Sequence, residues 1–326
     1  MRDAVISAAL QDTQWANWAR KPIAGDASAR RYWRLSMQGH PPAILMDDPP
    51  NGTGATTRFA DIATALTGIG LAAPAIHHHD TALGLMVIGD LGPTDFAAHL
   101  RDNPDEEATL YGAATDILVA LHLQPWSLPL STITPPVAAE MIDLVAIHYA
   151  ATPAALSDLT HAMQGAYSQL VDPTPHLALR DFHAENLIWR PDLGGTQRVG
   201  LLDFQDACYA PAGYDLMSLL RDARRDVVPS VATQAITQFC TATGADHRSM
   251  SAHLACVSAQ RNLRILGIFA RLAKQDGKLK YLALLPRVWG HLSRDLAHPA
   301  LVNLKQVVDA ALPPPDAKTL QRLGAV

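Results

Sequence analysis

Apolar and polar positions in the first 90 residues predict a small lobe built mainly of strands. Short apolar runs separated by turn-forming residues occupy residues 23–46, and a further apolar run covers 83–88. Runs of this length bounded by Gly, Pro, Asn or Asp are typical of β-strands. Between them, apolar residues recur at helical spacing over 58–69, and Gly70 follows as a stop signal. The segment 89–92 then ends the last strand of this lobe.

The rest of the chain predicts a larger lobe that is mainly helical. Apolar residues recur at helical spacing in most of it, above all over residues 214–296. Two short apolar runs, 177–179 and 199–204, interrupt this pattern and predict strands. We therefore expect an α+β chain with the bilobal outline of a protein kinase. A small antiparallel sheet is expected in a lobe of residues 1–92, and helices in a lobe of residues 93–326.

Composition and charge narrow the class of protein. Of 326 residues, 48% are hydrophobic and 17% are charged, so most of the chain is expected to pack. The formal net charge is -5 and the basic residues are spread along the chain, which argues against nucleic acid as a partner. Three cysteines in no zinc-binding pattern indicate a reducing compartment. The chain shows neither a signal-peptide core nor a long apolar run, so we expect a soluble cytoplasmic protein without a membrane span.

The most informative polar residues accompany the two apolar runs of the second lobe. Asp181 follows the first run and precedes Asn186 by five residues, and Asp203 stands within the second run. Phosphoryl transfer needs a carboxylate that accepts or orients the proton of the attacking hydroxyl. It also needs oxygen ligands that hold Mg²⁺ against the phosphates. The spacing predicts a kinase-like site in which Asp181 is the base and in which Asn186 and Asp203 bind the metal.

The same residues carry a resemblance to a known family. The segments 179–186 (LRDFHAEN) and 202–204 (LDF) resemble the aminoglycoside phosphotransferase/choline kinase superfamily. Within that superfamily, most of the chain is similar to bacterial anomeric kinases of cell-wall recycling. The segments that carry this closer similarity are 25–34, 46–50, 202–227, 260–269 and 285–289.

The resemblance implies a phosphotransferase that depends on ATP and Mg²⁺ and has an alcohol group as acceptor. In the anomeric-kinase branch, the acceptor is the C1 hydroxyl of N-acetylmuramate or N-acetylglucosamine, which belongs to peptidoglycan recycling. His183 stands where the superfamily often has a histidine near the γ-phosphate, and a packed loop histidine fits it equally well. Two other hypotheses stay open: a different hydroxyl acceptor, such as an aminoglycoside or a choline-like alcohol, and a nucleotide-binding pseudokinase.

Several residues are expected to contact the nucleotide. The segment that resembles the loop over the triphosphate consists of Gly25, Asp26, Ala27 and Ser28. Gly89 and Leu91 belong to the lobe junction, where the backbone is expected to meet the adenine edge. The third strand, residues 43–46, lacks the lysine with which the superfamily binds the α- and β-phosphates. Either Arg31 or Arg34 replaces it, or Mg²⁺ carries more of the phosphate charge; we favour an arginine, because the guanidinium fork fits phosphate oxygens.

The acceptor is expected to meet residues of the last third of the chain. The candidates are Asp206, Arg221, Asp222, Arg261 and Arg264. Arginine suits a carboxylate such as the lactyl group, and ordinary ion pairs are the competing interpretation. Asp215 is expected either to accept hydrogen bonds from the backbone near the base or to cap a helix. The segment 77–79, three histidines, is expected to be a solvated turn. The partner is expected to be a small amino sugar, bound by a monomer.

Overall fold

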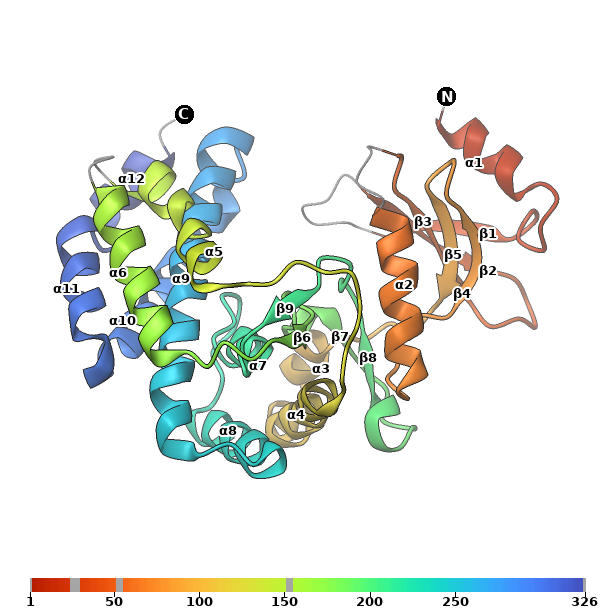
Figure 1. Ribbon diagram of the computed structural model, residues 1–326. Coiled ribbons are helices and arrows are strands. Elements are labelled where there is room, and N and C mark those ends of the chain that lie inside the picture. Colours follow the sequence, from red (N-terminus) through yellow and green to blue (C-terminus); the bar gives the residue numbers. More distant parts are fainter. Residues whose placement is uncertain (1, 24–29, 51–54, 151–154, 325–326) are drawn as a thin grey trace. The chain divides into compact units, whose positions relative to one another are not determined.

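The computed structural model describes residues 2–23, 30–50, 55–150 and 155–324. These residues form two compact units, which Figure 1 draws in the colours of the sequence. The first unit comprises Met1–His99 and Glu185–Gln205, and the second comprises Leu100–Ala184 and Asp206–Val326. This grouping places the segment 185–205, which the sequence assigns to the second lobe, with the first unit. The functional boundary at residues 92 and 93 stays a prediction.

The first unit is built around a five-stranded antiparallel sheet with the strand order β1-β2-β3-β5-β4. Figure 1 shows helices α1 and α2 on opposite sides of this sheet. The antiparallel sheet confirms the predicted architecture of the small lobe. The elements are α1 (Arg2–Leu10), β1 (Ala19–Ile23), β2 (Arg31–Ser36), β3 (Ala43–Asp47), α2 (Ala55–Gly68), β4 (Ile76–Asp80), β5 (Leu85–Gly89), α3 (Phe96–Asp102), which continues into the second unit, β7 (Leu187–Trp189) and β8 (Val199–Leu201).

One face of the sheet packs against α1. Leu35 of β2, Leu45 of β3 and Val87 of β5 are buried on this face. They pack in one cluster with Ile6 and Leu10 of the helix. Because strand side chains alternate between the two faces, every second residue of these strands points the other way, toward α2. Polar residues of these strands that bind a ligand on the α2 side must therefore be among the residues that point toward α2.

The three histidines at 77–79 belong to a strand, so the predicted solvated turn is wrong. They form most of β4, an edge strand that pairs antiparallel with β5. The imidazole rings of His77 and His78 lie beside the indole of Trp15, at centre-to-centre distances of 6.3 and 6.2 Å. Pairing with β5 supplies the backbone hydrogen bonds of the segment. That interaction is a tertiary one, which local composition does not reveal.

The segment 185–205 forms a short hairpin that packs in the first unit. Its strands β7 and β8 pair antiparallel, and the sequence predicted β8 but missed β7. The N–H of Leu201 donates a hydrogen bond of 2.8 Å to the carbonyl of Ala72, after α2. Just beyond β8, the ring of Phe204 stacks on that of Phe59 of α2 at 4.7 Å between centres. These contacts attach the hairpin to the part of the first unit that carries α2.

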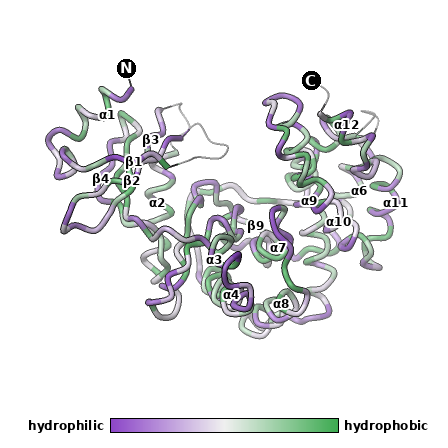
Figure 2. The backbone as a smooth tube through the Cα atoms, turned by 180° about the vertical axis from the view of Figure 1, so that it is seen from behind, coloured by the Kyte–Doolittle hydropathy of each residue, from purple (hydrophilic) through white to green (hydrophobic). Residues whose placement is uncertain are grey.

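The second unit is mainly helical, as predicted. Helix α4 buries an apolar stripe that includes Leu110, Ile117 and Leu121, and the long helical pattern predicted over residues 214–296 is divided among several helices. In Figure 2 the helices change between green and purple along their length, as expected where one side is apolar. The elements are α4 (Glu107–Leu123), α5 (Pro135–Glu140), the π-helix η2 (Val145–Tyr149), α6 (Ala155–Leu170), β6 (His176–Ala178), β9 (Cys208–Ala210), α7 (Tyr214–Leu220), α8 (Pro229–Thr243), α9 (His247–Asp276), α10 (Leu285–Leu296), α11 (Val302–Ala311) and α12 (Ala317–Gly324).

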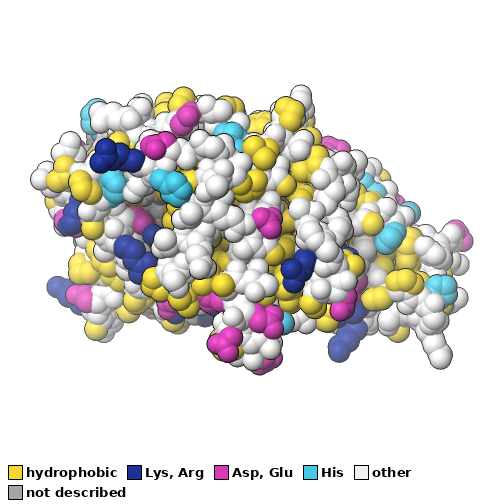
Figure 3. Space-filling view, turned by 90° about the horizontal axis from the view of Figure 1, so that it is seen from below, with side chains coloured by type: hydrophobic (Ala, Val, Ile, Leu, Met, Phe, Trp, Pro, Cys, Tyr) yellow, Lys and Arg dark blue, Asp and Glu magenta, His cyan; other side chains and the backbone are white. Residues whose placement is uncertain are grey.

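Two surface properties of the described chain bear on its class. None of the described helices is both long and apolar enough to cross a membrane. On the face shown in Figure 3, Lys and Arg side chains are dispersed and do not join into one patch. This face therefore shows no basic patch, and the role of each arginine depends on its own partners.

Helix α9 crosses the second unit and packs closely against η2. Asp246 caps its start by accepting a hydrogen bond of 2.9 Å from the N–H of Ser249, and Gly277 ends it in the left-handed conformation. At Gly267 an added Cβ would lie 2.4 Å from the carbonyl carbon of Leu144 and from the backbone nitrogen of Val145. Only glycine therefore allows the two backbones to approach each other at this point.

We predict that Gly267→Ala destabilises the protein although alanine favours helix. The methyl group would overlap backbone atoms that cannot rotate away, and overpacking of this kind costs about 1–3 kcal/mol. Gly165→Ala is the matched control, because Gly165 lies within α6 and an added Cβ there meets no atom of the described chain within 4 Å. It should stabilise by about 0.5–1 kcal/mol. Urea unfolding of both variants checks this; equal effects would contradict the close packing.

Candidate active site

A buried carboxylate positions the loop that carries the predicted base. Strand β6 leads into this loop, residues 179–184. Asp215, at the start of α7, accepts hydrogen bonds from the backbone N–H groups of Leu179 (2.5 Å) and Arg180 (3.0 Å). The first interpretation of Asp215 is thus confirmed. The second, a helix cap, is wrong, because Gly213 occupies the cap position and, among the described residues, no side chain caps α7.

The carbonyl group of Arg180 is held as firmly as its N–H group. It accepts hydrogen bonds from Oγ of Ser218 (3.1 Å) and Nη1 of Arg261 (3.3 Å). Nη2 of Arg261 also donates to Ser218 (2.5 Å). These contacts hold Arg180 at a φ of 72°, a left-handed conformation that costs a non-glycine residue roughly 1–2 kcal/mol. The exposed side chain of Asp181 follows directly, and backbone strain of this kind is concentrated at functional sites.

A second buried carboxylate holds the other end of the same loop. Asp222, just after α7, accepts a hydrogen bond of 2.8 Å from the backbone N–H of Arg224, and the nearby backbone of Ala184 also lowers its pKa. Its exposed fraction is 3%, which argues against the predicted contact with an acceptor. Burial raises the pKa of both carboxyl groups, that of Asp215 to about 6, and the backbone hydrogen bonds partly offset this rise. Both carboxylates therefore stabilise the loop.

His183 lies within this loop and is neutral at physiological pH. Burial lowers its pKa to about 3, and the positive charges of Arg224 and Arg261 contribute to the decrease. A neutral imidazole has one N–H donor and one acceptor nitrogen. His183 can therefore donate a hydrogen bond to a phosphate oxygen, but it is too weak a base to compete with a carboxylate for a proton.

The predicted metal ligands lie at the two ends of the β7–β8 hairpin. The N–H of Leu202 donates to the carbonyl of Asn186 (3.0 Å), so the two ends are adjacent. Asp203 has a φ of 56°, and among the described residues it shares a positive φ only with Arg180 and with glycines. Its side chain is 47% exposed, and Gln205 donates to one of its oxygens (2.8 Å). A carboxylate and an amide oxygen suit a hard cation, so this donor set fits Mg²⁺.

A cation approaches Asp203 from the start of β2. Nη1 of Arg30 lies 4.0 Å from Oδ1 of Asp203, and Nε of Arg30 donates to Asp48 (2.8 Å). Burial lowers the pKa of Arg30, but its hydrogen bond to Asp48 and the nearby negative charges outweigh this and raise the pKa overall. The sequence did not predict Arg30 for this role, because the face to which a strand residue points depends on a register that the sequence does not show.

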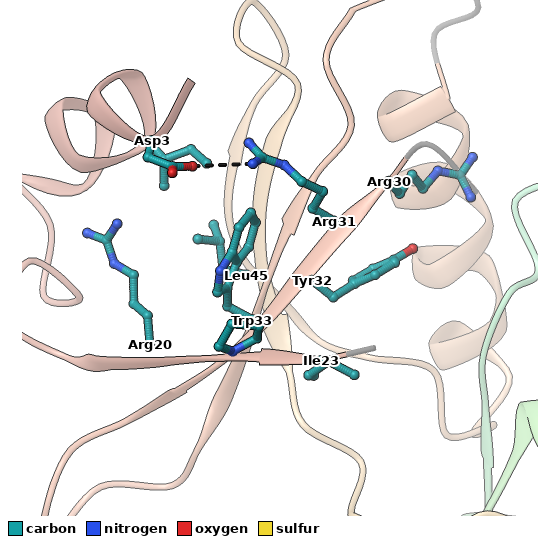
Figure 4. A pocket seen from close by; sticks show the side chains of 10 residues that line it. Asp3, Arg20, Ile23, Arg30, Arg31, Tyr32, Trp33 and Leu45 are labelled. Atoms are coloured by element: carbon teal, nitrogen blue, oxygen red, sulfur yellow. Dashed lines mark hydrogen bonds and ion pairs between the residues drawn. The ribbon is translucent and has the colours of Figure 1, made fainter. Parts of the chain in front are cut away.

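The two arginines predicted for this role have other partners. Arg31 points to the α1 side of β2 and donates to Asp47 (2.8 Å), whereas Arg30 leaves on the opposite side (Figure 4). Arg34 shares the side of Arg30, because strand residues alternate, but its Nε donates to Asp90 (2.5 Å). The geometry therefore favours Arg30 over Arg31 and Arg34 as the cation next to Asp203.

The remaining residues predicted at the nucleotide have mixed outcomes. The N–H of Gly89 donates to the carbonyl of Ala75 (2.8 Å) and is used within the first unit. The side chain of Leu91 lies close over Gly200 of β8, where an added Cβ would meet it at 3.0 Å. Leu91 therefore stays a candidate for the adenine contact. Gly25, Asp26, Ala27 and Ser28 lie outside the described residues.

The predicted acceptor residues also divide into two groups. Arg221 forms an ion pair with the buried carboxylate of Asp295 (3.2 Å), and Arg261 holds the loop as described above. Both arginines thus have structural partners, as the competing interpretation expects. Asp206 is exposed after the hairpin, and Arg264 is partly exposed on α9. These two residues stay available for an acceptor.

The chain combines a small antiparallel sheet with a helical unit, and the loop of the predicted base precedes the hairpin of the predicted metal ligands. Protein-kinase-like phosphotransferases have this arrangement. In that class the protein contributes mainly positioning and charge, and the clamped loop and the strained aspartate fit such a task. The chain belongs to the phosphotransferase enzyme family, which it matches over residues 19–253. It is therefore an enzyme of phosphoryl transfer.

Similar proteins cover almost the whole chain. N-acetylmuramate/N-acetylglucosamine kinase of Caulobacter vibrioides is 33% identical, over 96% of this chain and 97% of that protein. The enzyme of the same name from Pseudomonas putida is 28% identical, over 94% of this chain and 93% of that protein. Among solved structures, Plasmodium vivax ethanolamine kinase has a TM-score of 0.65 at 10% identity, over 92% of this chain and 89% of that one. The last similarity shows the fold alone and confirms the kinase-like architecture.

We predict that Asp215→Ala lowers both stability and turnover. Two buried N–H groups would lose their acceptor, which costs about 1–3 kcal/mol for an unsatisfied group, and the loop around Asp181 would lose its position. Urea unfolding and steady-state kinetics measure the two effects. Asp246→Ala is the control, because it removes a carboxylate that caps α9 and should cost about 1 kcal/mol without changing turnover. Equal turnover in the two variants would contradict the positioning role of Asp215.

Proposed function

We propose that the protein is an ATP-dependent kinase that phosphorylates the anomeric C1 hydroxyl of N-acetylmuramate or N-acetylglucosamine. The observation that carries the chemistry is the pair of left-handed residues, Arg180 and Asp203, held in place beside the predicted base and at the predicted metal ligand. The acceptor is supported by the two similar kinases, which match nearly the full chain at 33% and 28% identity. A cytoplasmic location and a role in peptidoglycan recycling accompany this proposal.

In the proposed reaction, the acceptor oxygen attacks the γ-phosphorus of ATP. An oxygen–phosphorus bond to the sugar forms, the bond between the γ-phosphorus and the β,γ-bridging oxygen breaks, and ADP leaves. The exposed carboxylate of Asp181 accepts or orients the proton of the sugar hydroxyl. Asn186 and Asp203 would hold Mg²⁺, which when bound neutralises phosphate charge. His183, neutral, donates a hydrogen bond to the transferred group.

Arg30 supplies the positive charge that the third strand lacks. It lies on the α2 side of the sheet, beside the carboxylate of Asp203, and its guanidinium is mostly buried at the entrance to β2. A guanidinium fork binds two phosphate oxygens at once, so it can replace the lysine of the superfamily. The absence of that lysine is then no sign of a pseudokinase, because the charge comes from a neighbouring strand.

We predict that Arg30→Met weakens nucleotide binding by about 10- to 100-fold, the equivalent of roughly 1.5–3 kcal/mol for a hydrogen bond to a charged group. Arg31→Met is the matched control, because it removes the adjacent arginine from the other face of the same strand. It should leave nucleotide affinity unchanged. Calorimetric titration with the magnesium complex of a nonhydrolysable ATP analogue measures both. Weaker binding only in the Arg31 variant, or in neither, would refute the assignment.

A panel of acceptors tests the function itself. The protein is incubated with labelled ATP, Mg²⁺ and, separately, N-acetylmuramate, N-acetylglucosamine, kanamycin and choline. Label on an amino sugar, with loss of its reducing-end reaction, is the expected result, because phosphate on C1 blocks ring opening. Transfer only to kanamycin or choline, or nucleotide binding without any transfer, would overturn the proposal.

With the active acceptor, we predict that Asp181→Asn lowers turnover by about 10²- to 10⁴-fold, because the proton of the hydroxyl loses its acceptor. Nucleotide affinity should change little, since Asp181 does not hold the triphosphate. Asp309→Asn, an exposed residue on α11, is the control for the same chemical change and should keep full turnover. A variant at Asp181 that retains wild-type turnover would exclude it as the base.

A further inference from the structure

Helix α9 has one partly exposed stripe along an otherwise buried middle section. Arg261, Arg264, Ile265, Ile268 and Arg271 lie on this stripe, at the spacing of one helical face. The stripe starts at the base loop, because Arg261 donates to the carbonyl of the residue before Asp181. Residues one turn further along the stripe are therefore placed to meet whatever binds beside that loop within the second unit.

Most arginines of the second unit near this loop have assigned partners. Arg180 donates to the carbonyl of Asp206 (3.3 Å), Arg221 pairs with Asp295 (3.2 Å) and Arg225 pairs with Glu107 (2.6 Å). Arg261 donates to two oxygens and lies over the ring of Tyr214 at 4.5 Å. Among the described residues, none forms a hydrogen bond or an ion pair with the guanidinium of Arg264.

The position of Arg264 is unfavourable for a cation without a counter-ion. Burial lowers its pKa, and the positive charges of Arg180 and Arg261 lower it further, while Asp181 and Tyr214 offset part of this. Moving an unpaired charge out of water costs free energy, so an arginine in this situation indicates a site where a ligand supplies the anion. No carboxylate of the described residues pairs with the guanidinium of Arg264, so a bound ligand would have to supply the anion.

We propose that Arg264 binds a carboxylate of the acceptor and makes the enzyme favour an acidic amino sugar over a neutral one. N-acetylmuramate carries a lactyl group, a carboxylate with a methyl group beside it, and N-acetylglucosamine has only a hydroxyl at that carbon. The carboxylate fits the guanidinium fork of Arg264, and the methyl group fits Ile265 and Ile268 on the same stripe. This inference rests on the proposed function, since it assumes that the acceptor binds beside Asp181.

The test compares the two sugars in matched variants of the full chain. Arg264→Met should lower kcat/KM for N-acetylmuramate by about 10- to 100-fold and change that for N-acetylglucosamine less than about twofold, so the ratio of the two falls. Arg264→Lys, which keeps the charge but loses the fork, should fall in between. Arg271→Met, two turns further along the stripe, controls for the loss of one positive charge and should keep the wild-type ratio.

A stability measurement separates this role from a structural one. Because Arg264 has no hydrogen-bond or ion-pair partner within the described parts of the chain, Arg264→Met should leave the Tm unchanged or raise it, whereas replacing an arginine that stabilises the fold would lower the Tm. Equal losses with both sugars, as expected if Arg264 bound the transferred phosphate, would overturn the proposal, and so would an unchanged ratio or a lower Tm. Failure of the proposed function shows separately, as a wild-type protein that phosphorylates neither sugar.

Discussion

Two buried carboxylates, one at the start of α7 and one just after it, determine the conformation of the base loop. Asp215 accepts hydrogen bonds from the first two N–H groups of the loop, and the backbone of Ala184 at its end lies near enough to Asp222 to lower the pKa of that carboxyl group, so α7 and the segment after it hold both ends of the loop. Both oxygens of Asp215 accept hydrogen bonds from the backbone of the loop, whereas Oδ1 of Asp222 accepts from Arg224 and its buried Oδ2 has no hydrogen-bond partner among the described residues. The exposed Asp181 is thus held between two fixed points, which is the preorganisation that positioning catalysis needs.

The distribution of arginines follows from the same constraint. Arg221 and Arg225 neutralise buried carboxylates, and Arg261 completes the hydrogen bonds of the strained loop. These residues serve the fold, although their sequence positions resemble those of ligand-binding residues. Arg30 and Arg264 differ from them, since Arg30 lies beside the exposed metal ligand and Arg264 has no counter-ion among the described residues. Arg30 keeps an ion pair with Asp48, so what distinguishes it is its position beside Asp203 and not an uncompensated charge.

The hairpin 185–205 brings the backbone of Asn186 next to that of Leu202, the residue before Asp203. Its two ends are joined by a backbone hydrogen bond, and its contacts with the segment after α2 and with Phe59 attach it to the sheet unit. Asn186 and Asp203, the predicted metal ligands, therefore belong to the unit that carries Arg30, while Asp181, the predicted base, belongs to the helical unit.

The sequence alone determined the class of elements and the identities of the chemical groups. Hydrophobic spacing predicts the antiparallel lobe and the helical lobe, and the spacing of Asp181, Asn186 and Asp203 predicts their chemistry, because both are local patterns in the chain. Only the tertiary structure decided that the three histidines belong to β4, that Arg30 lies beside Asp203, and that no residue the structure describes pairs with Arg264. Strand register, the direction of a side chain and the pairing of charges depend on segments distant in sequence, so no local pattern carries them.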